Sequence, residues 1–181
     1  MKKIVLVIVA MFTLGAFTAS AQKISYLDYI QVMDSLDTFK TAIAKSEEVQ
    51  LEFEATMQYL QEDYQKKAID YQNQMDSLPE ILRQMREKEL YDIQALSEQK
   101  QAEYQASLQT IQERYFVPLE KWLKEAVAIV GKAKGLDYIL YYDEENSIFW
   151  VNLEKAVDVT NVVITEMLRL EKENPITTPG G

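Results

Sequence analysis

The residues able to carry out chemistry are few in this 181-residue chain, because it contains neither histidine nor cysteine. Without histidine, the commonest general base and metal ligand, neither a Ser-His-Asp nor a Cys-His arrangement can be built. Acidic pairs remain at Glu47–Glu48 and Glu144–Glu145. We expect the first pair on a solvated helix and the second in a turn, with no apolar pocket around either. The sequence therefore predicts a protein that is not an enzyme and has no metal or cofactor.

Tyrosine and methionine side chains favour a different chemistry, which is weak and adaptable apolar binding. The chain has eleven tyrosines and seven methionines, many of them between residues 53 and 104. Flexible surfaces rich in such side chains suit binding to many different partners. The candidate binding residues are Tyr59, Tyr64, Tyr71, Met75, Met85 and Tyr91.

Two long amphipathic helices must position these side chains. Residues 16–130 contain no glycine, and only Pro79 and Pro118 interrupt them. Such a stretch, rich in Glu, Gln, Lys, Ala and Leu, is typical of long helices. Apolar residues recur every three or four positions from Phe53 to Leu78, and about every 3.7 residues from Leu82 to Ala126. Each stripe is too narrow to stabilise a lone helix, so each helix needs the other.

The break between the two helices lies at Ser77–Glu80, a capping-box pattern in which proline is tolerated. The sequence therefore predicts an antiparallel helical hairpin over residues 38–117 with its tip near 77–80, and a single helix kinked at Pro79 is the alternative. Asp37 or Thr38 is the expected N-cap of the first helix.

The stripes leave two roles open for the candidate binding residues. Tyr64, Tyr71, Met75 and Met85 lie on the stripes, where they would either bind a partner or pack one arm against the other. Tyr59 and Tyr91 fall off the stripes and are the better binding candidates.

A small body should carry the hairpin, since arms of this length exceed what a globular domain of this mass requires. We expect the body to comprise residues 22–37 and 118–170, followed by a disordered tail over 171–181. Strands are predicted at 23–29, 136–142 and 147–152, the last two joined as a β-hairpin by residues 143–146. Asp158 or Thr160 should cap a final helix that ends at Leu170. The fold class is thus mainly α with a small β body.

The predicted sheet is so small that its edges remain open to pairing with other chains. We therefore expect the protein to assemble into an oligomer through the body. The residues expected in this interface are Ile24, Tyr26, Ile139, Tyr141, Phe149 and Trp150.

The first 21 residues have the order of features that is typical of a secretory signal peptide. Lys2 and Lys3 precede an apolar run of about 14 residues, which is shorter than the roughly 20 that span a bilayer. Ala19-Ser20-Ala21 then forms a small-x-small cleavage site. We expect cleavage after Ala21 and no stable membrane insertion of the mature chain, and an uncleaved N-terminal anchor is the alternative.

The mature chain is strongly acidic. Removing two lysines leaves 17 basic and 29 acidic residues, so the net charge is 17 minus 29, or −12. Affinity for nucleic acids comes mainly from Lys and Arg on phosphates, so nucleic-acid binding is not expected. Tight binding to anionic membrane surfaces is disfavoured for the same reason.

The order of these parts resembles the Skp/OmpH family of periplasmic chaperones. The resemblance covers essentially the whole mature chain. It rests on the strand at 23–29, the long polar hairpin, the return at Val117–Leu119, the run over 135–142 and Asp158–Thr160 before the last helix.

The resemblance implies a periplasmic homotrimer whose three hairpins surround a cavity. Unfolded outer-membrane proteins would be held in that cavity without ATP. The best-known family members are basic, whereas this chain is acidic, so capture of acidic lipid is not expected. Arg83, Arg86 and Lys88 near the tip form its basic cluster, and an ordinary solvated helix face with interleaved glutamates is the alternative.

A coiled-coil spacer or adaptor of the cell envelope is the alternative function. A stiff spacer needs a continuous Leu, Ile and Val seam. Here Glu89 and Lys100 fall on the second stripe, which favours arms that bend. We therefore expect flexible arms that bind clients and a body that supplies stability.

Overall fold

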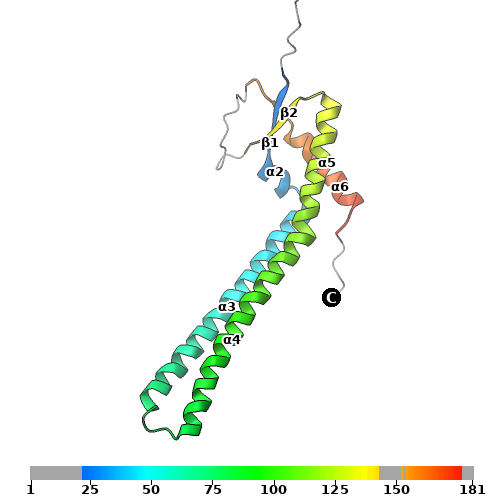
Figure 1. Cartoon of the computed structure of the whole chain (residues 1–181). Helices are drawn as coiled ribbons and strands as arrows, with labels where there is room; N and C mark the ends of the chain where they lie inside the picture. The colour runs from blue at the N-terminus through cyan, green and yellow to red at the C-terminus, as the bar shows by residue number, and fades with distance from the viewer. Residues whose placement is uncertain (1–21, 143–151, 153, 177–181) are drawn as a thin grey trace, which may run out of the picture.

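The computed structural model describes residues 22–142, 152 and 154–176, and it has a long two-helix hairpin that projects from a small body (Figure 1). Helices α3 (Asp37–Gln74) and α4 (Glu80–Ile111) form the two arms and pack side by side. The predicted antiparallel hairpin and the mainly helical α+β class are therefore confirmed. The predicted signal peptide, residues 1–21, lies outside the described residues.

The arms meet along the predicted apolar stripes. Leu60 of α3 and Ile93 of α4 are buried between the helices. The rings of Phe53 and Tyr104 stack across the seam, with centroids 4.3 Å apart and planes 11° apart. The second stripe is not buried throughout, since Leu82 and Met85 near the tip are 43% and 54% exposed. Ser97 is partly buried at the seam, whereas Leu96 points outward with 39% of its surface exposed.

The tip is a short turn over residues 75–79. The alternative of a single helix kinked at Pro79 is therefore wrong. Pro79 is the N-cap of α4 and makes no side-chain cap. The predicted capping box does not form, because the Ser77 hydroxyl donates to the Gln74 carbonyl at 2.8 Å and thereby closes the end of α3. Arg83 reaches back to the Leu78 carbonyl at 3.2 Å.

The second arm enters the body without a break in the helix. Residues Gln112–Phe116 form one π-helical turn, η1, between α4 and α5 (Val117–Lys134). In this wide turn the Val117 N–H donates to the Gln112 carbonyl, five residues back. Pro118 follows at the start of α5. The wide turn leaves space for the proline ring and tolerates the loss of the hydrogen bond that proline, without an N–H, cannot donate. The predicted interruption is thus a bulge in a continuous helix.

The body contains a three-stranded parallel sheet in the order β2-β1-β3. Its strands are β1 (Ile24–Asp28), β2 (Tyr138–Tyr142) and β3 (Val157–Asp158). The first two match predicted strands, and the sheet joins them although more than 100 residues separate them in the sequence. β3 was not predicted. The predicted strand at 147–152 and its loop at 143–146 lie outside the described residues, except for Asn152.

The core lies between this sheet and three helices, α2 (Tyr29–Asp34), α5 and α6 (Thr160–Glu173). Gly135 ends α5 in the left-handed region, with φ of 60°, a conformation that favours glycine. The buried residues of the core are Leu27, Val32, Met33, Leu36, Leu119, Trp122, Leu123, Ala126, Val130, Val159, Val163, Met167 and Leu170.

Neither α3 nor α6 has the N-cap residue that the local sequence predicts. Neither Asp37 nor Thr38 caps α3; instead the Thr38 N–H donates to the Glu171 carboxylate of α6 at 2.7 Å. At the start of α6, Asp158 accepts from the Thr160 N–H at 2.9 Å, but the N-cap position is Val159, which makes no side-chain cap, instead of Asp158 or Thr160. The helix α6 then continues to Glu173, three residues beyond the predicted end, so the start of the predicted disordered tail is helical.

Candidate functional site

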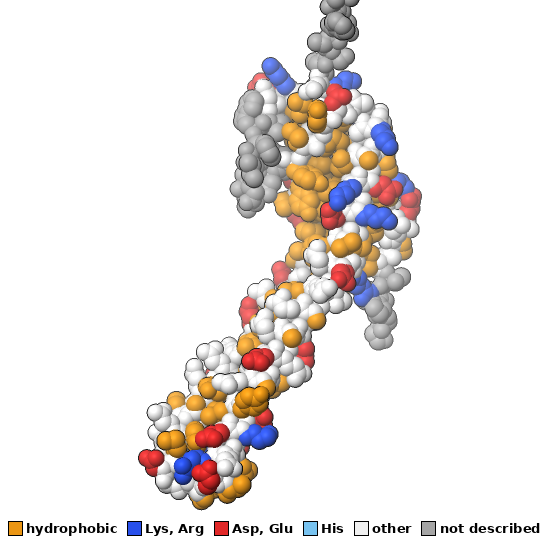
Figure 2. Space-filling model, in the orientation of Figure 1, with side chains coloured by type: hydrophobic (Ala, Val, Ile, Leu, Met, Phe, Trp, Pro, Cys, Tyr) orange, Lys and Arg blue, Asp and Glu red, His pale blue; other side chains and the backbone are white. Residues whose placement is uncertain are grey.

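The tip of the hairpin carries an apolar surface that no other described element covers. Each arm ends here, and the sides of its last turns that face away from the other arm have no further described element beside them. Ile81 is 65% exposed and Met85, one turn further along the same face, is 54% exposed. Figure 2 shows hydrophobic side chains gathered at this end of the hairpin. The exposed members of this tip surface are Met75, Ile81, Leu82 and Met85.

Two of the predicted binding residues belong to the seam. The Tyr71 hydroxyl donates to the Glu87 carboxylate of α4 at 2.6 Å, and the Tyr64 hydroxyl accepts from the Gln94 amide at 3.2 Å. The hydrogen bond to Glu87 is the main cause that raises the pKa of Tyr71. Both rings are partly buried. The structure thus gives Tyr64 and Tyr71 a role in joining the arms, and partner binding by them stays a prediction.

The other predicted binding residues are accessible. Tyr59 and Tyr91 are each 68% exposed, as expected for positions off the stripes. Met75 and Met85 lie on the tip surface. The sequence stripes missed Leu51, Ile69 and Ile81, which are exposed by 65%, 58% and 65%. For Ile81 a signal was present, since it precedes Leu82 of the second stripe by one position and therefore falls off that stripe.

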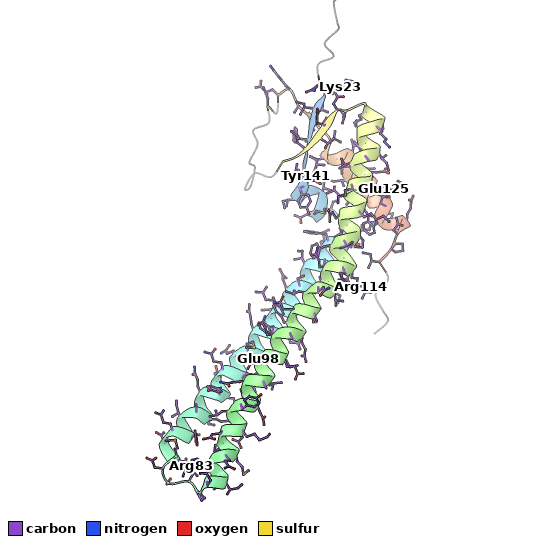
Figure 3. All side chains as sticks on the ribbon, in the orientation of Figure 1. Lys23, Arg83, Glu98, Arg114, Glu125 and Tyr141 are labelled. Carbon is purple, nitrogen blue, oxygen red and sulfur yellow. The ribbon has the colours of Figure 1, made fainter. Side chains whose placement is uncertain are left out.

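An open groove runs between the arms about midway along them, with a volume of about 600 Å³. Its apolar floor is made by Met57, Leu60 and Ile93. The groove exists because the small Ser97 occupies a seam position opposite α3, and its hydroxyl turns back to the Ile93 carbonyl at 2.9 Å. Glu98, labelled midway along the arms in Figure 3, lies at the polar edge. This groove can accept an apolar side chain while its edge stays hydrated.

The basic cluster near the tip is neutralised within its own helix. Arg86 contacts Glu89 at 2.9 Å, and Lys88 contacts Asp92 at 2.7 Å, a contact whose hydrogen bond raises the pKa of Lys88. Arg83, labelled at the tip in Figure 3, lies 3.9 Å from Glu80. Exposed pairs of this kind contribute little binding or stability. The cluster is therefore best described as an ordinary solvated helix face.

The body has an apolar sheet face of its own. Ser25 and Leu27 of β1 point into the core, so Ile24 and Tyr26 lie on the opposite face. By the register of the sheet, Tyr138 and Leu140 of β2 lie beside Ile24 and Tyr26, and both are exposed. We call these four residues the open sheet face.

The remaining residues predicted for the oligomer interface lie elsewhere. Ile139 packs against the core instead of facing outward. Tyr141 is 59% exposed, and its ring meets that of Tyr29 edge-on at 5.7 Å. Phe149 and Trp150 lie outside the described residues.

The described part of the chain offers neither a metal-binding cluster nor a membrane-spanning helix. Among residues 22–142, 152 and 154–176, no cluster of three or more acidic side chains is placed to hold a metal ion. No helix in that part of the chain is long and apolar enough to cross a membrane.

Comparison with known proteins agrees with the geometry. A crystal structure from Caulobacter crescentus CB15, described as a proposed outer membrane chaperone (OmpH-like), superposes with a TM-score of 0.54. The match covers 88% of this chain and 89% of that one at 13% sequence identity, so it shows a shared fold. No curated protein matches the chain. The family model for outer membrane proteins (OmpH-like) matches residues 23–167. This match extends over most of the sequence, and the chain therefore belongs to the OmpH-like family.

Proposed function

We propose that this protein is an ATP-independent holdase chaperone of the periplasm, which binds unfolded outer-membrane proteins with its helical arms and prevents their aggregation. The observation that carries the proposal is the set of exposed apolar side chains on the arms. They lie at the tip and on faces turned away from the seam, and no other element of the described chain covers them. Family membership and the shared fold support a chaperone-like role.

The chemistry of the arms suits weak and repeated contacts with an unfolded chain. Isolated tyrosines, methionines and aliphatic residues are spaced along the arms among charged and amide side chains. Each contact buries a small apolar area, and many together hold a client without a specific sequence. The net charge of −12 in the mature chain makes copies of the protein repel one another in solution, whether or not they hold a client. Such binding requires no catalytic residue, nucleotide or metal.

Polar substitution of the tip surface should weaken client binding. In the double variant Ile81→Gln with Met85→Gln, we expect roughly tenfold weaker binding, from about 0.7 kcal/mol of lost apolar burial per side chain. Glutamine is a good helix former and both positions are exposed, so the fold should not change. The measurement is the concentration of mature protein that halves the aggregation of a urea-unfolded outer-membrane β-barrel protein, without ATP.

The control is the double variant Ile129→Gln with Val162→Gln, which removes two apolar residues, 38% and 42% exposed, from helices of the body. It should protect the client as the unmodified protein does. Equal losses from both pairs would show that the tip is not the binding surface. An unmodified protein that fails to protect the client would favour the coiled-coil spacer or adaptor.

The proposal includes assembly into a homotrimer through the body, the number three being implied by the family resemblance. The open sheet face is apolar, and among the described strands β2 and β3 lie at the edges of a small sheet. Light scattering at micromolar concentration should give three times the mass of the mature chain. Leu140→Lys should shift the mass toward the monomer, because it places a charge on the open sheet face. A stable monomer of the unmodified chain would contradict the assembly.

Export belongs to the proposal as well. Expressed with residues 1–21 in a Gram-negative host, the protein should be recovered from the periplasm with Gln22 as its first residue. N-terminal sequencing provides the measurement. A sequence that begins at Met1 would favour the uncleaved anchor.

A further inference from the structure

The junction between arms and body contains two places where the backbone can bend. On one side, only Ser35 and Leu36 separate α2 from α3. On the other, the π-helical turn η1 joins α4 to α5, and the path of the helix changes direction there (Figure 1). Short linkers and π-bulges are common sites of hinge motion. The direction of the arms must therefore be set by contacts that cross this junction.

The first such contact comes from the last turns of α6. The Glu171 carboxylate accepts the hydrogen bond of the Thr38 N–H at 2.7 Å, in a partly buried position. This N–H belongs to the first turn of α3, where backbone donors have no partner within the helix. The first arm thus takes its cap from a residue 133 positions later in the chain. A carboxylate at this position is also favoured by the helix dipole of α3.

The second contact comes from the residues that follow α6. Asn174 ends the helix, since both its backbone N–H and its side-chain amide donate to the Leu170 carbonyl, at 2.9 and 3.0 Å. Pro175 and Ile176 follow the helix. Ile176 packs against a small cluster made by Ala42 of α3, Ile111 of α4 and Tyr115 of η1. Ile176 therefore packs on a cluster to which both arms and the π-helical turn contribute, and it packs against the body core as well.

We propose that Glu171 and Ile176 form a C-terminal clamp that fixes the direction of the arms relative to the body. The clamp is anchored in the body, because Val163, Met167 and Leu170 on the preceding turns of α6 are buried in the core. It acts on the arms at both bending points. Both clamp residues lie beyond position 167, where the match to the family model ends.

Distances between spin labels test the clamp independently of client binding. The chain has no cysteine, so Gln65→Cys on α3 and Lys132→Cys at the end of α5 place one label on an arm and one on the body. Both positions are exposed. The mature labelled protein is mixed with an excess of unlabelled chain, so that pulsed EPR reports distances within one copy.

Two matched pairs of variants isolate the clamp residues. A chain ending at Asn174 loses Ile176, whereas a chain ending at Ile176 keeps it. Glu171→Ala removes the cap of α3, whereas Glu173→Ala removes an equal charge that pairs with Arg169 on the same helix. We expect the distance distribution to broaden in the chain ending at Asn174 and in Glu171→Ala. The chain ending at Ile176 and the Glu173→Ala variant should give the same distance distribution as the full mature chain.

Hydrogen exchange gives a second measurement. In Glu171→Ala the Thr38 amide should exchange about tenfold faster or more, as expected for loss of a hydrogen bond to a charged group. Amides of the core helix α5 should be unchanged. Equal distance distributions in the two truncated chains, or an unchanged distribution in Glu171→Ala, would overturn the clamp.

Discussion

Removal of about five helical turns from each arm should abolish protection of an unfolded outer-membrane protein and leave the body folded and assembled. The deletion takes out residues 54–71 and 87–104. These segments face one another, since Phe53 stacks on Tyr104 at one end and Tyr71 bonds to Glu87 at the other. Because five turns contain about 18 residues, the seam on either side of the deletion stays in phase.

The expected loss of protection follows from what the deletion removes. The shortened arms lack Tyr59, Ile69, Tyr91 and the groove floored by Leu60 and Ile93, but they keep the tip surface. If binding sums many weak contacts along the arms, the tip alone holds a full-length client poorly. Every residue of the body core lies outside the deleted segments, so the body should fold as before.

Aggregation assays of the shortened protein, together with its mass and its thermal unfolding, decide between the outcomes. Unchanged mass and unfolding temperature with no protection would support the proposal. Full protection by the shortened protein would place the client site on the tip or the body. Failure of the shortened protein to assemble would make the arms structural and favour the spacer.

The hairpin could be predicted because its signals are local. The spacing of apolar residues from Phe53 to Leu78, the break at Pro79 and the absence of glycine across the arms each follow from short-range helix chemistry. Alternation of apolar and polar residues likewise located β1, and β-rich composition located β2. These features need no knowledge of distant contacts.

The junction could not be predicted because it depends on contacts between distant segments. Glu171 caps α3 across 133 positions, and no pattern near Thr38 contains that information. β3 has two residues, which is too short for a periodic signal, and it forms because β1 offers an open edge. Pro118 indicated a disturbance of the helix, but whether it breaks the helix or widens one turn depends on the packing of Phe116 against Phe39.

The candidate site was predicted in part, and the differences have a common cause. Tyr59 and Tyr91 are exposed because they lie off the stripes, as the spacing indicates. Tyr64 and Tyr71 contain both an apolar ring and a hydroxyl, and the sequence does not say that Gln94 and Glu87 stand opposite them. Whether a tyrosine on the stripe packs between the arms or binds a client therefore depends on the residue that lies opposite it in the other arm.

Leu123→Ala should lower the free energy of unfolding by about 3 kcal/mol, whereas Leu60→Ala should cost about 1 kcal/mol or less and act only on the arms. Both leucines are buried, with 2% and 5% of their surface exposed. Their surroundings differ. Leu123 lies in a core enclosed by several elements of the body. Leu60 lies between two helices and borders the open groove.

The difference follows from how each site responds to the lost atoms. An enclosed core retains a cavity, which adds to the lost burial, whereas the arms can close together or admit water. Tryptophan fluorescence during denaturation, at equal chain concentrations because assembly also stabilises, should show a lower midpoint for Leu123→Ala alone. Leu60→Ala should instead speed amide exchange in α3 and α4 near the groove. An equal fall in midpoint for both variants would mean that the arms unfold together with the body, and a rigid spacer would then explain the hairpin better than a flexible binding arm.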